Sequence, residues 1–356
     1  MAGSSVTPSG LAALGTLVFQ NTALVLLMRT AVTNGTGFLA STAVVCDECM
    51  KLTLCTVVMI MYYIFKAPSA YMTPLPYGGS PRKSVIGLLR FLRRECFGQS
   101  VVDIFKMSVP ALCYTVQKNC LFLALTHLEA AVYQVTYQAK ILTTALFSCA
   151  LLGKPMSYKQ VMALFVLTIG VAVIQVDGLV DRPHRDYLVE QKPIVGLVAV
   201  LCACMTSGFA GTFFELQLKT PSFSHSSCSP ELAKEFSMWV RNMHLAMFAL
   251  SIGVVGSLYK DGAIILEHGF LQGYTSLTWL VIFLEAAGGI VVALVIKYTD
   301  NILKNFATAI SIVTSTAVSS LAMGFAITPA FCVGTVLVLL AVPMYQRNPP
   351  SKSEAR

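Results

Sequence analysis

The sequence predicts an all-α integral membrane protein with about ten transmembrane helices. Three observations lead to this fold class. Of the 356 residues, 56% are hydrophobic and only 12% are charged, whereas a soluble domain averages about 25% charged residues. Apolar segments of about 20 residues, the length that spans hydrocarbon, recur along the chain. The loops between these segments share the basic residues very unequally.

Ten apolar segments can be delimited, and each is expected to form one helix. The last two segments lie close together, so nine or eleven spans remain alternatives to ten. The segments cover residues 11–30, 38–65, 104–126, 130–150, 157–176, 193–217, 238–258, 277–297, 302–325 and 326–346.

The basic residues predict the orientation of the chain. Thirteen Lys and Arg residues fall on one side and four on the other, namely Arg182, Arg185, Lys192 and Lys260. Because cytosolic loops are enriched in Lys and Arg, both termini and the loops after even-numbered spans are expected in the cytosol. The net charge of +8 follows mostly from this asymmetry. The lipid bilayer is therefore the expected partner, and nucleic acid is not.

A short repeat divides the chain into two halves. The stretch KILTTA from Lys140 resembles KNFATA from Lys304, and both read KxxxTA. Each lies in the fourth span of five, and an odd number of spans inverts the second half relative to the first. Inverted repeats are typical of transporters with a site near the midplane. The expected parts are a first half at 1–176 with cytosolic loop 66–100, a lumenal connection at 177–192, a second half at 193–346 and a cytosolic tail at 347–356.

Lys140 lies in the middle of its apolar segment, where a charge costs about 2.5 kcal/mol or more. Tyr133 lies two helical turns earlier on the same face, and Tyr137 lies three residues before the lysine. A cation beside aromatic rings suits a ligand with a phosphate and a planar base. The alternative is a buried ion pair of Lys140 with Glu215 or Glu285.

Lys304 is the second candidate for phosphate binding. Asn301 and Thr308 flank it at positions −3 and +4. Two lysines from the two halves would hold a diphosphate as point charges. The alternative for Lys304 is anchoring at the membrane surface.

Two further patterns carry predictions. Asp47 and Lys51, in the second segment, have the i,i+4 spacing of an ion pair on one helix. The small residues of SGFAG, from Ser207 to Gly211, permit close helix packing and also leave room for a ligand. No GxSxG, Walker, HExxH or paired CxxC motif occurs, so no catalytic residue, cofactor or metal is predicted.

Five stretches resemble the Golgi nucleotide-sugar transporters, in the branch that carries UDP-galactose, UDP-N-acetylglucosamine and CMP-sialic acid. The resemblance spans about residues 14–345 and implies the drug/metabolite-transporter fold. It also implies exchange of a cytosolic nucleotide sugar for a lumenal nucleoside monophosphate. The stretches are LVFQNTALVLLMR, AAVYQVTYQAKILTTALFSCALLGK, SGFAGTFFE, WVRN and GGIVVALVIKYTDNILKNFATAISIVTS.

The resemblance also implies roles for individual residues. Tyr137, Asn301 and Thr308 are included in the candidate site because of their spacing from Lys140 and Lys304, and not because of the resemblance. Two departures from the family pattern concern Lys118, where the family has asparagine, and Glu285, where it has glutamine. The carried-over residues are Tyr133 and Lys140 as a nucleotide-contacting pair, Gln117 and Asn242 at the nucleotide site, Lys304 at the phosphate, and Ser207 and Gly208 in the wall of the sixth span.

The expected function is that of a UDP-sugar antiporter in the Golgi membrane. It would exchange UDP-N-acetylglucosamine or UDP-galactose for UMP by alternating access. The alternatives are a CMP-sialic acid transporter, a facilitative metabolite exporter of the same fold, and a non-transporting membrane scaffold. The ER is the alternative location, and a homodimer is left open.

Overall fold

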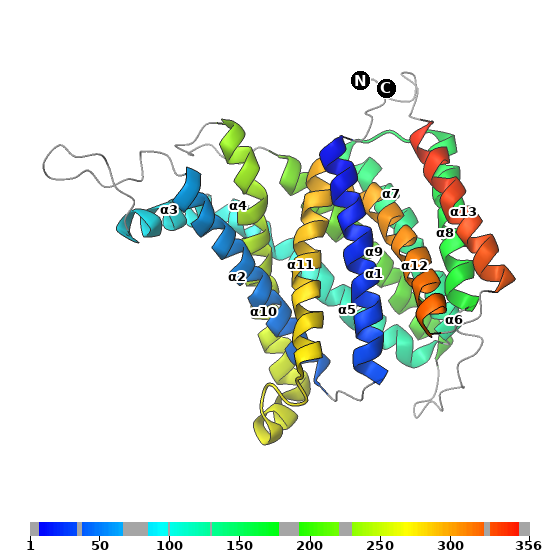
Figure 1. The fold of residues 1–356 in the computed structure, drawn as a ribbon, viewed down its shortest axis with the longest axis horizontal. Helices are drawn as coiled ribbons and strands as arrows, with labels where there is room; N and C mark the ends of the chain where they lie inside the picture. The colour runs from blue at the N-terminus through cyan, green and yellow to red at the C-terminus, as the bar shows by residue number, and fades with distance from the viewer. Residues whose placement is uncertain are drawn as a thin grey trace, which may run out of the picture. The chain divides into compact units, whose positions relative to one another are not determined.

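The computed structural model describes residues 7–33, 38–66, 85–98, 100–128, 130–177, 192–220, 230–323 and 328–348. Every regular element within these ranges is an α-helix, which confirms the predicted all-α class. The helices drawn in Figure 1 are α1 (Pro8–Thr33), α2 (Ala40–Lys66), α3 (Val85–Phe97), α4 (Val101–Phe105), α5 (Ser108–His127), α6 (Ala130–Tyr137), α7 (Ala139–Leu152), α8 (Tyr158–Asp177), α9 (Pro193–Lys219), α10 (Pro230–His268), α11 (Ser276–Tyr298), α12 (Asn301–Met323) and α13 (Pro329–Gln346).

The ten predicted apolar segments all coincide with helices. Within the described ranges, seven helical stretches are long and apolar enough to cross a membrane, namely α1, α6 with α7, α8, α9, α10, α11 and α13. Helices α2, α5 and α12 cover the other three segments. Four charged residues in α2 and Lys304 in α12 reduce the apolar character of those helices. The number of ten spans therefore stays a prediction.

Contacts divide the chain into two compact units. The first unit comprises Met1–Gly35, Cys113–Leu216 and Leu294–Arg356. The second unit comprises Thr36–Leu112 and Gln217–Ala293. The two inverted halves are defined by topology rather than by contacts, and they stay a prediction.

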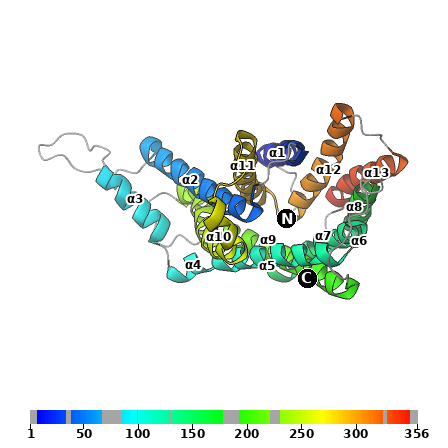
Figure 2. The ribbon, with the colours of Figure 1, turned by 90° about the horizontal axis from the view of Figure 1, so that it is seen from below.

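The first unit contains a tight pair of helices, α8 and α13, which lie side by side in both views (Figures 1 and 2). A Cβ atom on Gly170 would lie 3.0 Å from the carbonyl oxygen of Gly334, so the two backbones nearly touch. Leu167 and Val338 are fully buried in the apolar core around this pair. Small residues are the usual means of such close approach within a membrane.

The second unit is built around α2 and α10, which pack along each other. Helix α10 has 39 residues and exceeds the predicted span at 238–258. Its regular geometry breaks at Asp261, where φ is −120°. The side chain of Ser41, at the start of α2, donates a hydrogen bond to the Asp261 carboxylate. This contact ties the break in α10 to the beginning of α2.

The predicted ion pair on α2 is confirmed. The Nζ atom of Lys51 lies 3.6 Å from Oδ2 of Asp47 and 3.0 Å from Oε1 of Glu48. All three side chains are nearly buried, and the stem of Lys51 lies against Gly289 of α11. One lysine therefore serves two carboxylates within the second unit.

Several predicted loops lie largely outside the described residues. They are most of the cytosolic loop 66–100, most of the lumenal connection 177–192, and most of the tail 347–356. The part of loop 66–100 that the structure describes contains helix α3, and α4 follows directly after the loop.

Candidate functional site

The predicted fourth span is interrupted beside Lys140. It consists of α6 and α7, which meet at Gln138. The amide of Gln138 donates to the carbonyl of Val135 at 3.1 Å, and the amide of Ile141 donates to the carbonyl of Gln138 at 3.0 Å. These i→i−3 bonds tighten the helix locally, and such a stretch inside a helix often marks a functional hinge. Lys140 is the second residue of α7, the helix that follows the break.

Tyr137 is the centre of a polar and aromatic cluster. Its ring stacks on that of Tyr133, with the centroids 5.9 Å apart and an interplanar angle of 12°. The Nζ atom of Lys140 lies 4.2 Å from the centroid of the Tyr137 ring, within the range of a cation–π contact. The amide of Gln117 on α5 donates to the Tyr137 hydroxyl at 2.9 Å, and Ser207 on α9 also bonds to this hydroxyl.

The cluster thus joins five residues predicted for the site: Gln117, Tyr133, Tyr137, Lys140 and Ser207. They come from four helices of the first unit. The predicted same-face placement of Tyr133, Tyr137 and Lys140 is confirmed by the ring contacts. Their role in binding a ligand stays a prediction.

Gly208 lets α9 approach this region closely. A Cβ atom on Gly208 would lie 2.8 Å from the backbone carbon of Thr143 and 2.9 Å from the amide nitrogen of Thr144. The hydroxyl of Thr143 donates to the carbonyl of Cys204 at 2.7 Å. Close packing at the SGFAG stretch is therefore confirmed, and the wall of the cluster is backbone rather than side chain.

The two copies of the KxxxTA motif make the same hydrogen bond. The hydroxyl of Thr144 donates to the carbonyl of Lys140 at 2.7 Å, and that of Thr308 donates to the carbonyl of Lys304 at 3.0 Å. Each threonine thus bonds back to its own motif's lysine one turn earlier. The echo in the sequence corresponds to a shared local geometry.

Lys140 and Lys304 are also electrostatic neighbours within the first unit. Both are partly buried, and their ammonium groups are close enough to repel each other. Among the described residues of this unit, no carboxylate forms an ion pair with either lysine. Two neighbouring lysines of this kind are what a phosphate site requires, and their role in binding phosphate stays a prediction.

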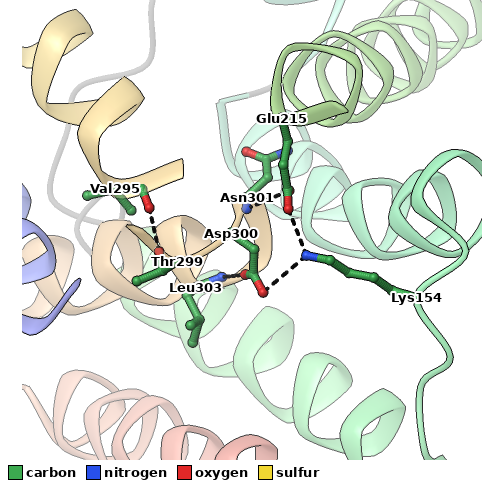
Figure 3. A network of polar contacts seen from close by, with 7 residues as sticks. All are labelled: Lys154, Glu215, Val295, Thr299, Asp300, Asn301 and Leu303. Carbon is green, nitrogen blue, oxygen red and sulfur yellow. Dashed lines mark hydrogen bonds and ion pairs between the residues drawn. The ribbon is translucent and has the colours of Figure 1, made fainter. Parts of the chain in front are cut away.

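Glu215, one of the two carboxylates proposed as alternative partners of Lys140, is engaged elsewhere, whereas Glu285 belongs to the second unit and its pairing stays a prediction. Oε1 of Glu215 lies 2.7 Å from Nζ of Lys154, which also lies 3.4 Å from Oδ2 of Asp300 (Figure 3). Oε2 of Glu215 accepts a hydrogen bond of 3.0 Å from the amide of Asn301, at the start of α12. An ion pair of Lys140 with Glu215 is thus absent from the described structure, and Lys154 pairs with this carboxylate instead.

Lys154 reaches Glu215 because of the turn that precedes it. Gly153 ends α7 with φ of +60°, a left-handed conformation that glycine adopts readily. Burial lowers the pKa of Lys154, but the carboxylates of Asp300 and Glu215 outweigh burial and raise it. The lysine is therefore charged in this network.

Asn301, predicted to line a cavity, lies beside this network. Its side chain is fully buried against Gly211, and neither polar atom has a hydrogen-bond partner within the described structure. Its backbone amide binds Glu215. A contact of Asn301 with substrate stays a prediction.

Asn242 belongs to the second unit. Its side chain is buried on α10 and donates to the carbonyl of Met238 at 2.9 Å. Its predicted place at the nucleotide site, with Lys140 in the other unit, therefore stays a prediction. Lys118, which departs from the family pattern, is exposed on α5.

The Lys154 network was missed as a feature of the site. Lys154 counted only as one of the basic loop residues, and Asp300 had no role. A signal was present, because Lys154 closes the stretch ALLGK, Glu215 closes SGFAGTFFE, and Asp300 lies within KYTDNILK. All three lie in stretches that carry the family resemblance.

Comparison with known proteins agrees with this resemblance. A family model described as nucleotide-sugar transporter matches residues 10–346. A UDP-N-acetylglucosamine transporter of Mus musculus is 40% identical over 340 residues, which cover 94% of each chain. A UDP-galactose translocator of Bos taurus is 39% identical over 333 residues, which cover 93% of this chain and 76% of the other. A crystal structure with 14% identity has a TM-score of 0.61 and covers 96% of this chain and 98% of its own, a likeness of fold.

Proposed function

Because the chain belongs to the nucleotide-sugar transporter family, we propose that it carries a UDP-sugar into the Golgi lumen in exchange for UMP. The compared relatives are transporters rather than enzymes, and the chain is a transporter. The sugar we propose is N-acetylglucosamine or galactose, after the names of these relatives. Their identities to this chain, 40% and 39%, are too similar to choose between the two sugars.

One observation supports the region of Lys140 and Lys304 as the place where the substrate binds. Lys140 and Lys304 repel each other electrostatically, and neither forms an ion pair with a carboxylate among the described residues of their unit, although Glu215 attracts Lys304 at longer range. Their mutual repulsion is relieved when an anion lies between them. A diphosphate supplies such an anion, and charge-assisted hydrogen bonds to phosphate are about twice as strong as neutral ones. We infer that the two lysines hold the phosphates.

The base of the nucleotide is proposed to lie against Tyr133 and Tyr137. The stacked rings offer an aromatic surface, and the Gln117 amide held on the Tyr137 hydroxyl offers hydrogen-bonding groups beside it. Asn242, Ser207 and Gly208 are proposed to complete the nucleotide site, and Asn301 and Thr308 the region around Lys304. A pyrimidine fits the motifs that surround these residues.

Antiport follows from the same charges. A carrier with two unneutralised lysines changes its access slowly when it is empty, and UMP or UDP-sugar neutralises them. The two inverted halves would then rock around the central site. The predicted orientation, with both termini in the cytosol, makes the UDP-sugar enter from the cytosol and UMP from the lumen.

The test is uptake by proteoliposomes that contain the purified full chain. Vesicles preloaded with UMP are expected to take up UDP-N-acetylglucosamine or UDP-galactose several times faster than empty vesicles. CMP-sialic acid and a GDP-sugar serve as competitor substrates. Uptake of CMP-sialic acid alone would assign the other branch of the family, and uptake that is independent of internal UMP would indicate a facilitative exporter. Absence of uptake of every nucleotide sugar would favour a scaffold.

Orientation and location are tested in cells. Epitope tags at the two termini are both expected to be detected after selective permeabilisation of the plasma membrane, in a Golgi pattern. Detection of either tag only after the Golgi membrane is opened would overturn the predicted topology. An ER pattern would support the alternative location.

A further inference from the structure

Helix α3 is buried on one side within the described structure, and its exposed surface mixes apolar and basic residues, with Arg93 between Leu89 and Ile86. Gly87, Phe91, Glu95 and Cys96 are buried. Val85, Ile86 and Leu89 are apolar and exposed, with 73%, 59% and 61% of their surface accessible. The exposed basic residues are Arg90, Arg93 and Arg94.

The buried side fixes α3 to the second unit. The ring of Phe91 stacks on that of Tyr62 at the end of α2, with the centroids 6.1 Å apart and an interplanar angle of 14°. It also packs against Tyr63 at 5.6 Å. At the other end of α3, the Nε2 atom of His244 on α10 lies 2.6 Å from the carbonyl oxygen of Cys96. These contacts fix the rotation of α3, so the helix cannot turn to bury its exposed apolar and basic residues.

The exposed sides combine apolar and basic character. Val85 and Leu89 lie one turn apart on one face, and Arg90 and Arg94 lie one turn apart on the adjacent face. The acidic residue of the helix, Glu95, is 2% exposed and points inward. The outer surface of α3 thus presents three arginines and, among the described residues of this helix, no exposed carboxylate.

The predicted topology places this surface at a membrane boundary. Tyr62 and Tyr63 lie in the last turns of α2, which covers the second predicted span, so α3 lies beside the predicted end of that span. Figure 1 shows α3 running across the end of α2 rather than along it. The charge asymmetry of the loops assigns this end to the cytosol, where the leaflet carries anionic lipids.

We propose that α3 is an interfacial helix that binds anionic phospholipids of the cytosolic leaflet. Val85 and Leu89 insert between the acyl chains, as the apolar face of a surface helix does. Arg90, Arg93 and Arg94 bind the headgroup phosphates, to which a guanidinium can donate two parallel hydrogen bonds. An acidic protein segment would satisfy the arginines but would leave the apolar residues beside them in water, so the observations favour lipid.

The test measures the binding of lipid to the purified full chain in detergent micelles by native mass spectrometry. Phosphatidylserine and phosphatidylcholine with identical acyl chains are titrated separately. The unaltered chain is expected to bind phosphatidylserine at least about tenfold more tightly, because each basic residue near an anionic surface contributes about fivefold. The triple variant R90Q/R93Q/R94Q is expected to bind both lipids alike.

Three controls separate the causes. The variant K159Q/K219Q/R347Q removes three exposed charges elsewhere and is expected to keep the preference for phosphatidylserine. The variant R90K/R93K/R94K keeps the charge and is expected to keep most of the preference. Soluble glycerol phosphate at the same concentration is expected to bind measurably neither to the unaltered chain nor to R90Q/R93Q/R94Q. This result would separate binding of a lipid from binding of a free phosphate.

The proposal is overturned by any of three results. They are an equal preference in R90Q/R93Q/R94Q and the unaltered chain, a loss in the control variant as large as that in the arginine variant, or tight binding of glycerol phosphate. The melting temperature of each variant is also measured without lipid, to check that the fold is intact. It should be unchanged, because Arg90, Arg93 and Arg94 are exposed. UDP-sugar transport is not the readout, so this test stands independently of the proposed function.

Discussion

The Nζ atom of Lys154 lies 2.7 Å from Oε1 of Glu215, a residue 61 positions further along the chain. Glu215 is fully buried, and Lys154 is about one-third exposed. Through the second oxygen of Glu215 the contact extends to the amide of Asn301 at the start of α12 (Figure 3). One ion pair therefore connects the turn after α7, helix α9 and helix α12 within the first unit.

Replacement of Lys154 is expected to destabilise the protein. In Lys154→Met the buried carboxylate of Glu215 and the partly exposed carboxylate of Asp300 lose their cation, and removal of one partner of a buried pair typically costs about 3–5 kcal/mol. The partial exposure of Lys154 favours the lower end of this range. The measurement is thermal unfolding of the purified chain in detergent.

The matched control is Lys159→Met, which removes an exposed lysine near the start of α8. It should change the melting temperature little. The double variant Lys154→Met with Glu215→Gln should recover part of the loss, because the fully buried charge of Glu215 is removed and only the partly exposed Asp300 stays without its cation. Equal effects of Lys154→Met and Lys159→Met would contradict a structural role for the pair.

The contribution of Lys154 should not depend on pH in the neutral range. Its pKa is raised above its ordinary value of 10.5, because the two carboxylates outweigh the effect of burial. A raised pKa in the folded state stabilises the protein fully below the unfolded value and loses this effect only as pH rises through the folded value. The difference in melting temperature between the unaltered chain and Lys154→Met should therefore be the same at pH 7 and pH 9. A difference that shrinks across this interval would mean that the folded pKa is not raised.

Gly208 is expected to tolerate no side chain. A methyl group there would meet the backbone of Thr143 and Thr144 at 2.8–2.9 Å, and backbone atoms cannot move aside without separating α7 from α9. Overpacking of this kind costs about 1–3 kcal/mol. Gly208→Ala should therefore lower the melting temperature and weaken UMP binding. Gly15→Ala in α1, where a Cβ atom meets nothing within 4 Å, should do neither, and a neutral Gly208→Ala would show that the helices separate easily.

Lys140 and Lys304 are expected to act on the ligand rather than on the fold. Each charge-assisted hydrogen bond to phosphate is worth about 1.5–3 kcal/mol, so Lys140→Gln or Lys304→Gln should weaken UMP binding about tenfold to a hundredfold. Uncharged uridine should be affected less. Because the two ammonium groups repel each other, either replacement should leave the ligand-free melting temperature unchanged or raise it.

Thermal shift with and without UMP measures both effects in one experiment. A structural lysine would give the opposite pattern, with a lower ligand-free melting temperature and an intact shift on adding UMP. That pattern for Lys140 would remove it from the proposed phosphate site. The same pattern for Lys304 would support its alternative role as an anchor at the membrane surface.

Local patterns in the sequence predicted the long apolar helices of this protein, but not α3, the break between α6 and α7, or the full length of α10. Apolar runs of about 20 residues predicted where helices lie, because a helix that satisfies its own backbone hydrogen bonds is what such a run forms in lipid. The i,i+4 spacing of Asp47 and Lys51 predicted their ion pair. The spacing of Tyr133, Tyr137 and Lys140 placed them on one face, and the break at Gln138 did not separate them.

Contacts between helices were decided only by the tertiary structure. The sequence offered Glu215 as a partner for Lys140, but the rotation of α9 and the left-handed turn at Gly153 bring it to Lys154 instead. The proximity of Lys304 to Lys140, 164 positions away by their numbering, likewise depends on how α12 packs beside α7. Helical periodicity determines which residues share a face of one helix. It does not determine which face of a second helix lies opposite, because that depends on side-chain packing over the whole interface.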